Sequence, residues 1–344
     1  MRLLITGGAG FIGTRLARAL LARGTLAGRT IERLALADQA PPQADLATDP
    51  RVEVRVGPLL AQCAGLADER WDGVFHLASA VSGECEADFD LGLRSNLDST
   101  RALLDALRAS VAAGAAPTRL VFSSSVAVFG PDPSSPLPAR VGDTTLPAPK
   151  TSYGTHKLVC EHLIADYTRK GYVDGRSARL MTVTVRPGRP NGAASSFFSG
   201  IVREPLAGLE AICPVDASVS HPLTSPARTV EGLIAVFEAS AEALGGRLAL
   251  NLPAVNARVS DMLDALEAVA GREVRARVRF VRDPVIAGIV ANWPAGASAE
   301  RAARLGLRAD ADFADIIRQY IADCRAEPGG EAALAGLPAD GSGA

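Results

Sequence analysis

A short apolar run at residues 3–6 leads directly into a glycine-rich turn, Gly7-x-x-Gly10-x-x-Gly13, and a helical pattern begins inside that turn. Along the first half of the chain, short runs rich in β-branched residues go on alternating with longer helical patterns. Parallel strands need crossover helices between them, so this alternation is typical of a parallel sheet covered by helices. We therefore predict an α/β fold.

The predicted elements divide the chain into two lobes. Strands are predicted at residues 3–6, 33–37, 52–56, 73–77, 120–124 and 182–186, and helices at residues 11–23, 89–113 and from about residue 152. Beyond residue 187, helical segments at 197–206, 229–243, 260–269 and 312–324 are separated by proline-rich turns, which indicates a smaller lobe. We expect residues 1–187 to form the sheet domain, joined by segments within about 220–255, and residues 188–325 to form mainly a substrate-binding lobe over the strand ends. Residues 327–344 are expected to be a disordered tail.

The glycine turn predicts a dinucleotide site, because glycines there let helix N-terminal amides approach a pyrophosphate. Its expected contacts are Gly7, Gly10, Phe11, Ile12 and Gly13. Asp38 ends the second strand, where a carboxylate hydrogen-bonds the adenosine ribose and repels a 2′-phosphate. No arginine follows at residues 39–43 to accept that phosphate, so we predict NAD as the cofactor and not NADP. The alternatives are an ordinary glycine turn and a solvated aspartate.

Tyr153 and Lys157 lie four residues apart in a predicted helix and therefore share one face. A free phenol, with a pKa of about 10, is a poor base at neutral pH, but a nearby ammonium favours its charged form. Tyr153 is therefore the predicted general base. Ser125 closes the fifth strand in a run of three serines, and we predict that its hydroxyl stabilises the reacting oxygen. A serine run more often marks a turn, which is the alternative.

Further cofactor contacts are expected at other strand ends. Leu77, Ala78 and Ser79 follow the fourth strand, with Ser79 beside the nicotinamide ribose, and Pro187 follows the sixth strand. Asn96, on the long helix, either contacts the cofactor or buttresses the neighbouring strand.

The glycine turn, Ser125, Tyr153 and Lys157 together resemble the extended short-chain dehydrogenase/reductase family, from residue 1 to about residue 324. The resemblance implies a Rossmann-type doubly wound sheet, a bound nicotinamide cofactor and a Ser-Tyr-Lys site. The runs at residues 76–84, 87–92, 186–191 and 196–206 are similar to the D-erythronate dehydrogenase branch. That similarity implies oxidation of the hydroxyl beside the carboxylate of a four-carbon sugar acid, with NAD as acceptor.

Three departures from related patterns bear on this reading. Gly57-Pro58-Leu59 stands where many extended members carry an aspartate for the adenine. Residues 221–228 lack the R-D-F/Y-x-x-V type segment of nucleotide-sugar members, and Val126-Ala127 lacks the acids of a dehydratase. A nucleotide-sugar epimerase of the same fold and a non-catalytic NAD-binding sensor remain the alternatives.

The substrate is expected to be a small sugar acid whose carboxylate is held by an arginine of the second lobe. Arg189 and Arg228 are the candidates, because a guanidinium binds both carboxylate oxygens, although either could simply be solvated.

Composition excludes several other classes of protein. A net charge of -2 without a basic patch argues against nucleic-acid binding, and charged residues interrupt every apolar run before membrane-spanning length. Five scattered cysteines without a C-x-x-C pair indicate buried, reduced thiols and a cytoplasmic protein. The four histidines lack ligand partners at metal-binding spacing, so no metal is predicted. A homodimer is expected from the family.

Overall fold

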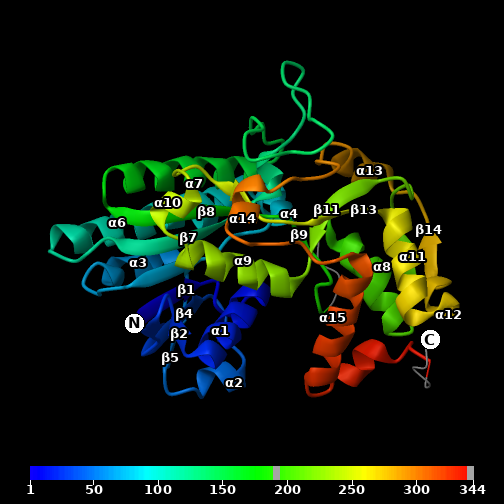
Figure 1. Ribbon diagram of the computed structural model, residues 1–344, viewed down its shortest axis with the longest axis horizontal. Coiled ribbons are helices and arrows are strands. Elements are labelled where there is room, and N and C mark those ends of the chain that lie inside the picture. Colours follow the sequence, from blue (N-terminus) through cyan, green and yellow to red (C-terminus); the bar gives the residue numbers. More distant parts are fainter. Residues whose placement is uncertain (189–193, 339–344) are drawn as a thin grey trace.

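The computed structural model describes residues 1–188 and 194–338, which form two lobes side by side (Figure 1). A seven-stranded parallel sheet organises the larger lobe, in the order β5-β4-β1-β6-β7-β8-β12. The strands are β1 (Arg2–Thr6), β4 (Arg33–Asp38), β5 (Val52–Val56), β6 (Gly73–His76), β7 (Thr118–Ser125), β8 (Val173–Leu180) and β12 (Leu250–Asn251). The order runs outward from β1 in both directions, which makes this a doubly wound sheet and puts a ligand crevice beside the end of β1.

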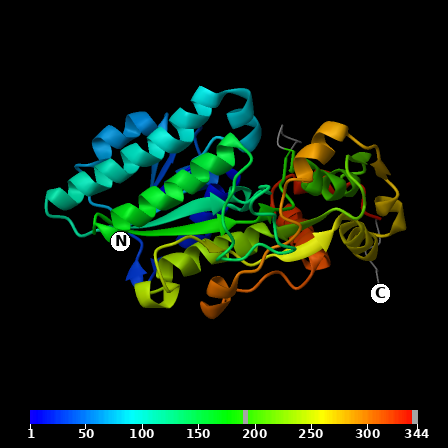
Figure 2. The ribbon, with the colours of Figure 1, turned by 90° about the horizontal axis from the view of Figure 1, so that it is seen from above.

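Helices cover both faces of this sheet (Figure 2). Leu3 and Ile5 pack against α1 (Phe11–Arg23) and α9 (Pro226–Glu238) on one face. Leu4, between them, belongs to the core under α3 (Leu59–Leu66), α6 (Ser99–Ala112) and α7 (Ser152–Arg169) on the other face. Both faces of each central strand are therefore buried, which explains the continuous apolar runs in the sequence.

The smaller lobe has its own hydrophobic core. Its sheets are β9 (Thr182–Val183), β11 (Ser220–Thr224) and β13 (Val255–Arg258), and the pair β10 (Ala211–Cys213) and β14 (Val278–Phe280). Its main helices are α8 (Ser196–Leu206), α11 (Val259–Ala270) and α15 (Phe313–Ala326). Shorter elements complete the molecule: β2 (Thr25–Leu26), β3 (Arg29–Thr30), α2 (Ala44–Ala47), α4 (Ser82–Ala87), α5 (Phe89–Gly92), π-helix η1 (Leu93–Asp98), 3₁₀ helix η2 (Val126–Val128), α10 (Ala241–Leu244), α12 (Arg272–Arg275), α13 (Pro284–Val290), α14 (Glu300–Arg304) and 3₁₀ helix η3 (Gly330–Leu334).

The structure corrects the predicted elements in several places. The sixth strand of the main sheet is β8, which had no counterpart in the prediction, while the strand predicted at residues 182–186 is the short β9 of the smaller lobe. The helix predicted at residues 89–113 contains the π-helix η1, and the one predicted at 229–243 is divided into α9 and α10. Of the segments expected to return to the larger lobe, β12 and α9 do so, whereas β11 and β13 belong to the smaller one.

The tail expected to be disordered from residue 327 is ordered as far as residue 338. There η3 packs Ala333 and Leu334 against the core of the smaller lobe. All five cysteines are buried free thiols, as predicted. None of the helices described is both long and apolar enough to cross a lipid bilayer.

Candidate functional site

The glycine turn joins β1 to α1 in a conformation that only glycine fits. Gly7 has a φ of 73°, and a Cβ there would lie 2.8 Å from the Ala78 nitrogen. At Gly13, inside the first turn of α1, a Cβ would lie 2.0 Å from the Gly7 carbonyl oxygen. Gly10 is the N-cap residue of α1, and no side chain caps this helix start. The helix N-terminus is thus open to an anion such as a pyrophosphate.

Asp38 stands at the end of β4, beside the glycine turn. Its Oδ2 accepts a hydrogen bond from the Ala9 amide at 3.0 Å, and its Oδ1 accepts one from the Gln39 amide at 2.6 Å. The carboxylate therefore lies at the edge of the turn, where the ribose of a dinucleotide bound there would be recognised. These residues fit NAD.

The segment after β6 is held by Asn96 of the π-helix. The Asn96 Oδ1 accepts hydrogen bonds from the Ala80 amide at 2.7 Å and from the Ser79 hydroxyl at 3.1 Å, and its Nδ2 donates to the Ala80 carbonyl at 3.2 Å. Leu77 and Ala78 lie against Gly7. Asn96 thus buttresses the strand end that faces the glycine turn, and its contact with the cofactor stays a prediction.

Helix α7 packs closely on η2, the short turn that follows Ser125. The Thr151 hydroxyl caps α7 by accepting from the Gly154 amide at 3.0 Å. Gly154 packs so tightly on the turn after β7 that a Cβ there would lie 2.2 Å from the Ala127 carbonyl oxygen. The first turn of α7, which carries Tyr153, therefore lies directly on the segment that follows Ser125.

Lys157 is buried, with 3% of its surface exposed. Its Nζ donates to the Ser123 carbonyl at 2.8 Å and lies 5.4 Å from the centre of the Tyr153 ring. The Ser125 Oγ accepts from the Ala127 amide at 3.1 Å, so its own proton remains available to a ligand. The predicted Ser125, Tyr153 and Lys157 set thus lies at one strand end.

Arg186, which sequence reasoning did not single out, interacts electrostatically with Tyr153 of this set. Its Nε donates to the Val183 carbonyl at 3.1 Å, and Arg203 of α8 donates to its backbone carbonyl at 2.8 Å. Burial lowers the pKa of the Arg186 guanidinium, the Tyr153 charge raises it, and the neighbouring Arg203 lowers it again. Among the described residues, no carboxylate lies within ion-pair distance of Arg186. Its position at the end of an apolar run was the available sequence signal.

The other predicted substrate residues lie elsewhere or outside the described ranges. Arg228 is half-buried near the start of α9 and forms a 2.6 Å ion pair with Glu231. The structure records no contact of Arg228 with the Ser125, Tyr153 and Lys157 set. Arg189 lies outside the described residues, and the predicted cofactor contact Pro187 is exposed just after Arg186.

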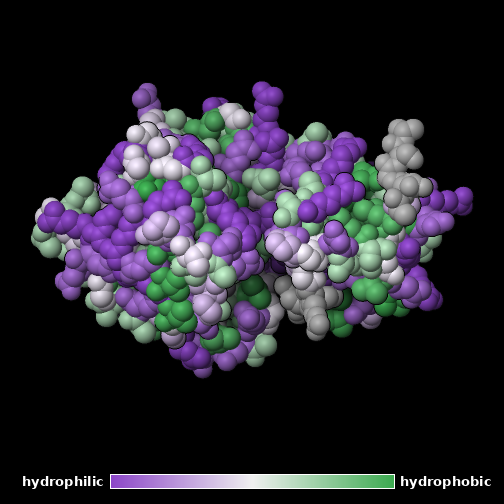
Figure 3. All heavy atoms as spheres, turned by 90° about the horizontal axis from the view of Figure 1, so that it is seen from below, coloured by the Kyte–Doolittle hydropathy of each residue, from purple (hydrophilic) through white to green (hydrophobic). Residues whose placement is uncertain are grey.

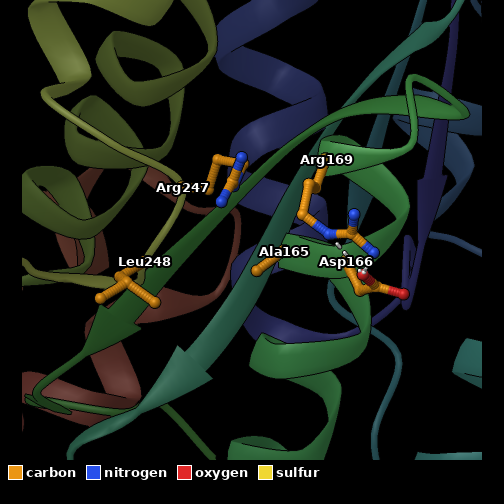
Figure 4. A pocket seen from close by; sticks show the side chains of 5 residues that line it. All are labelled: Ala165, Asp166, Arg169, Arg247 and Leu248. Atoms are coloured by element: carbon orange, nitrogen blue, oxygen red, sulfur yellow. Dashed lines mark hydrogen bonds and ion pairs between the residues drawn. The ribbon is translucent and has the colours of Figure 1, made fainter.

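The structure has two hollows that do not include Ser125, Tyr153 or Lys157. A small one of about 200 Å³ is lined by Ala165, Asp166, Arg169, Arg247 and Leu248, with Arg169 paired to Asp166 at 2.6 Å (Figure 4). A larger one of about 1020 Å³ lies between α1, α9 and α15, and the face seen from below is hollowed between the lobes (Figure 3). Ser125 and Tyr153 line neither hollow, so the candidate site is assigned from the functional groups of the predicted residues and not from a cavity.

Within residues 1–188 and 194–338, no group of three histidine, cysteine or acidic side chains could hold a metal ion.

Comparison with known proteins places this geometry in a family. Residues 3–247 match the model of the NAD dependent epimerase/dehydratase family. The D-erythronate dehydrogenase of Cupriavidus necator is 47% identical, over 94% of this chain and 98% of the relative. The D-erythronate dehydrogenase of Haemophilus influenzae is 40% identical, over 93% and 99%. A solved structure described as the nucleoside-diphosphate-sugar epimerase from Agrobacterium tumefaciens aligns with a TM-score of 0.89 and 41% identity, over 94% of each chain.

These matches confirm the predicted family resemblance, the doubly wound α/β fold, the NAD cofactor and the class of NAD-dependent oxidoreductase. The chain belongs to the NAD dependent epimerase/dehydratase family.

Proposed function

We propose that this protein oxidises the carbon-2 hydroxyl of a four-carbon sugar acid, D-erythronate, to the corresponding 2-oxo acid with NAD. The observation that carries the proposal is Arg186, a largely buried guanidinium that has Tyr153 as a charge neighbour and no carboxylate partner among the described residues. A buried positive charge without a partner is costly, and a bound carboxylate would supply that partner. The names of the two relatives support this choice of acid.

The neighbourhood of Arg186 and Tyr153 also favours carbon 2 as the reacting atom. Because Arg186 interacts electrostatically with Tyr153, a carboxylate bound to Arg186 would bring the adjacent carbon, with its hydroxyl, toward the Tyr153 phenol. Tyr153, in its charged form, takes the hydroxyl proton while Ser125 donates a hydrogen bond to the same oxygen. Bound NAD supplies the acceptor for the hydride that leaves carbon 2. Lys157, held on the Ser123 carbonyl, keeps a positive charge near the phenol throughout.

Arginine variants test the carboxylate assignment. Arg186→Met keeps much of the side-chain stem and removes the charge, so the efficiency with D-erythronate should fall tenfold to hundredfold, for a lost contact of about 1.5 to 3 kcal/mol. Efficiency with the neutral amide of the same acid should change little. Arg228→Met is the matched control and should stay close to the parent. If Arg228→Met or Arg189→Met loses the preference for acid over amide while Arg186→Met keeps it, the carboxylate is bound by that arginine instead.

A nucleotide-sugar epimerase is the second candidate, because the Agrobacterium structure bears that description at 41% identity. The two activities differ in cofactor use. A dehydrogenase converts free NAD to NADH in step with substrate, whereas an epimerase recycles bound cofactor without net NADH. Steady NADH production from D-erythronate and none from UDP-sugars supports the dehydrogenase; epimerised UDP-sugar with no acid oxidation would replace it. A protein that binds NAD but turns over neither class would be the non-catalytic sensor.

Five free, buried thiols suit a reducing compartment, which supports a cytoplasmic location. A homodimer remains a proposal, tested by the mass of the protein in solution.

A further inference from the structure

Helix α7 carries three functional groups at four-residue spacing, Tyr153, Lys157 and Glu161, so all three lie along one stripe of the helix. Lys157 reaches the Ser123 carbonyl of β7 at 2.8 Å. One turn later, the Glu161 Oε1 accepts a hydrogen bond from the Ser124 hydroxyl at 2.5 Å. Two consecutive residues of β7, directly before Ser125, are thus bonded to two consecutive turns of the catalytic helix.

Glu161 is buried, with 5% of its surface exposed, and is fixed from a third element. Arg179 of β8 binds it through both carboxylate oxygens, Nε to Oε1 at 2.9 Å and Nη2 to Oε2 at 2.7 Å. Arg179 lies directly opposite Ser124 in the parallel ladder. The carboxylate therefore joins the active-site ends of β7 and β8 to the middle of α7, and its charge is neutralised by an equally buried arginine.

The same arginine supports the chain on the other side of Ser125. Its guanidinium carbon lies 4.8 Å from the centre of the Phe129 ring, just after the turn that the Ser125 hydroxyl caps. Ser125 thus lies between two points held by the Glu161–Arg179 pair: Ser124 on one side and Phe129 on the other. Movement of the pair would displace Ser125 relative to Tyr153.

We propose that Glu161 is a positioning residue, which sets the register of Tyr153 and Lys157 against Ser125 through its bond to Ser124. It touches neither substrate nor cofactor. Reacting groups tolerate little displacement, since a 1 Å misplacement can cost about a hundredfold in rate. The alternative is that the buried pair only stabilises the fold, in which case its loss would lower the fraction of active enzyme but not the rate at each intact site.

Ser124→Ala separates these roles, because it removes the link to β7 and leaves the Glu161–Arg179 pair in place. Ser177→Ala is the matched control: Ser177 is a buried serine of the same sheet, on β8, whose hydroxyl has no hydrogen-bond partner among the residues the structure describes. The readout is a single turnover with enzyme in excess, in which the rate constant of NADH formation reports each site and the amplitude reports the active fraction. Ser124→Thr, which keeps a hydroxyl, tests for rescue.

For Ser124→Ala we expect a rate constant about tenfold below the parent, an unchanged amplitude and an NAD dissociation constant within about twofold of the parent. Glu161→Gln should slow the step at least as much, Ser124→Thr should recover most of the rate, and Ser177→Ala should match the parent. A Ser124→Ala rate constant within about twofold of the parent, or a loss confined to the amplitude, would overturn the proposal. The inference rests on the proposed function only for its substrate. A parent enzyme that does not oxidise D-erythronate but epimerises a UDP-sugar refutes that function, and the single-turnover rate constant is then read from formation of the epimerised UDP-sugar.

Discussion

The environment of Lys157 determines how its charge can act in the candidate site. The Lys157 ammonium is buried against the Ser123 carbonyl and the Phe122 ring, 4.7 Å from its centre, so its charge is little screened by water. In the proposed mechanism this ammonium stands one helical turn from Tyr153, the general base, with its Nζ 5.4 Å from the centre of the phenol ring.

Replacing Tyr153 by phenylalanine tests this role, because the ring stays and only the hydroxyl is lost. Turnover should fall by about a hundredfold to ten-thousandfold, the usual contribution of a positioned base. NAD affinity should be nearly unchanged, since the glycine turn and Asp38 are not altered. Steady-state kinetics and a direct NAD titration measure the two effects. Residual activity within tenfold of the parent would show that another group takes the proton.

The site residues predicted from the sequence are those whose spacing along the chain alone suggests a chemical role, and these roles stay predictions. Tyr153 and Lys157 share a helix face, and the glycines follow a strand, so short-range patterns suffice. Arg186 was missed because its role depends on the absence of an acid partner and on a neighbour 33 residues away, and neither is visible before the chain folds. Arg228 was predicted as a substrate contact because a guanidinium suits a carboxylate; the structure pairs it with Glu231, and its contact with substrate stays a prediction.

At the scale of elements, the contact between α7 and the end of β7 depends on one glycine. In Gly154→Ala the new Cβ would lie 2.2 Å from the Ala127 carbonyl oxygen and 3.0 Å from the Pro149 Cβ. Such overpacking costs about 1 to 3 kcal/mol of unfolding free energy and would displace Tyr153. Gly65→Ala in α3 is the control, since nothing lies within 4 Å of its added Cβ, and helix propensity should make it neutral or stabilising. Denaturant unfolding compares them; equal stability of the two variants would mean that α7 does not rest on this contact.

Elements with a regular apolar pattern were predicted with nearly their observed bounds, whereas a strand that buries charged side chains was missed. Helix α1 was predicted with its observed bounds, 11–23. Strand β8 was missed because Val-Asp-Gly-Arg-Ser-Ala-Arg-Leu reads as a polar loop. Its two arginines are nevertheless buried: Arg176 donates to the carbonyls of Val236, Phe237 and Ala239, and Arg179 binds Glu161. Hydrogen-bond partners distant in sequence thus compensate the burial of these two arginines in the strand. The π-helix η1 has no sequence signal of its own.

At the scale of the whole molecule, stability should depend on pH through two buried histidines. Burial and the Lys157 charge lower the pKa of His76 to about 3; burial lowers the pKa of His221 to about 4, although its hydrogen bond to Pro294 raises it. Histidine in an unfolded chain has a pKa of about 6.5, so below that pH the unfolded chain binds protons that the two buried histidines of the folded protein do not bind. The unfolding free energy should therefore fall as pH drops from about 6.5 to about 4, by up to about 1.4 kcal/mol per pH unit for each histidine.

Urea unfolding at several pH values in this window measures the slope. His221→Gln should flatten it by up to about one proton, whereas His162→Gln, at an exposed position of α7, should leave it unchanged. Carboxylates titrate alike in all three proteins and cancel in the comparison. Equal slopes for the parent and His221→Gln would show that His221 is not buried in its neutral form.

The central claim concerns the whole enzyme: that it removes a hydride from carbon 2 of a four-carbon sugar acid. The most direct measurement is to incubate the parent protein with NAD and D-erythronate deuterated at carbon 2, and to measure the deuterium content of the reduced cofactor by mass spectrometry. The account predicts one deuterium in each reduced cofactor formed, and none when the label is placed at carbon 3 or carbon 4. Deuterium arriving from carbon 3 or carbon 4, or no reduced cofactor while UDP-sugars are epimerised, would contradict it.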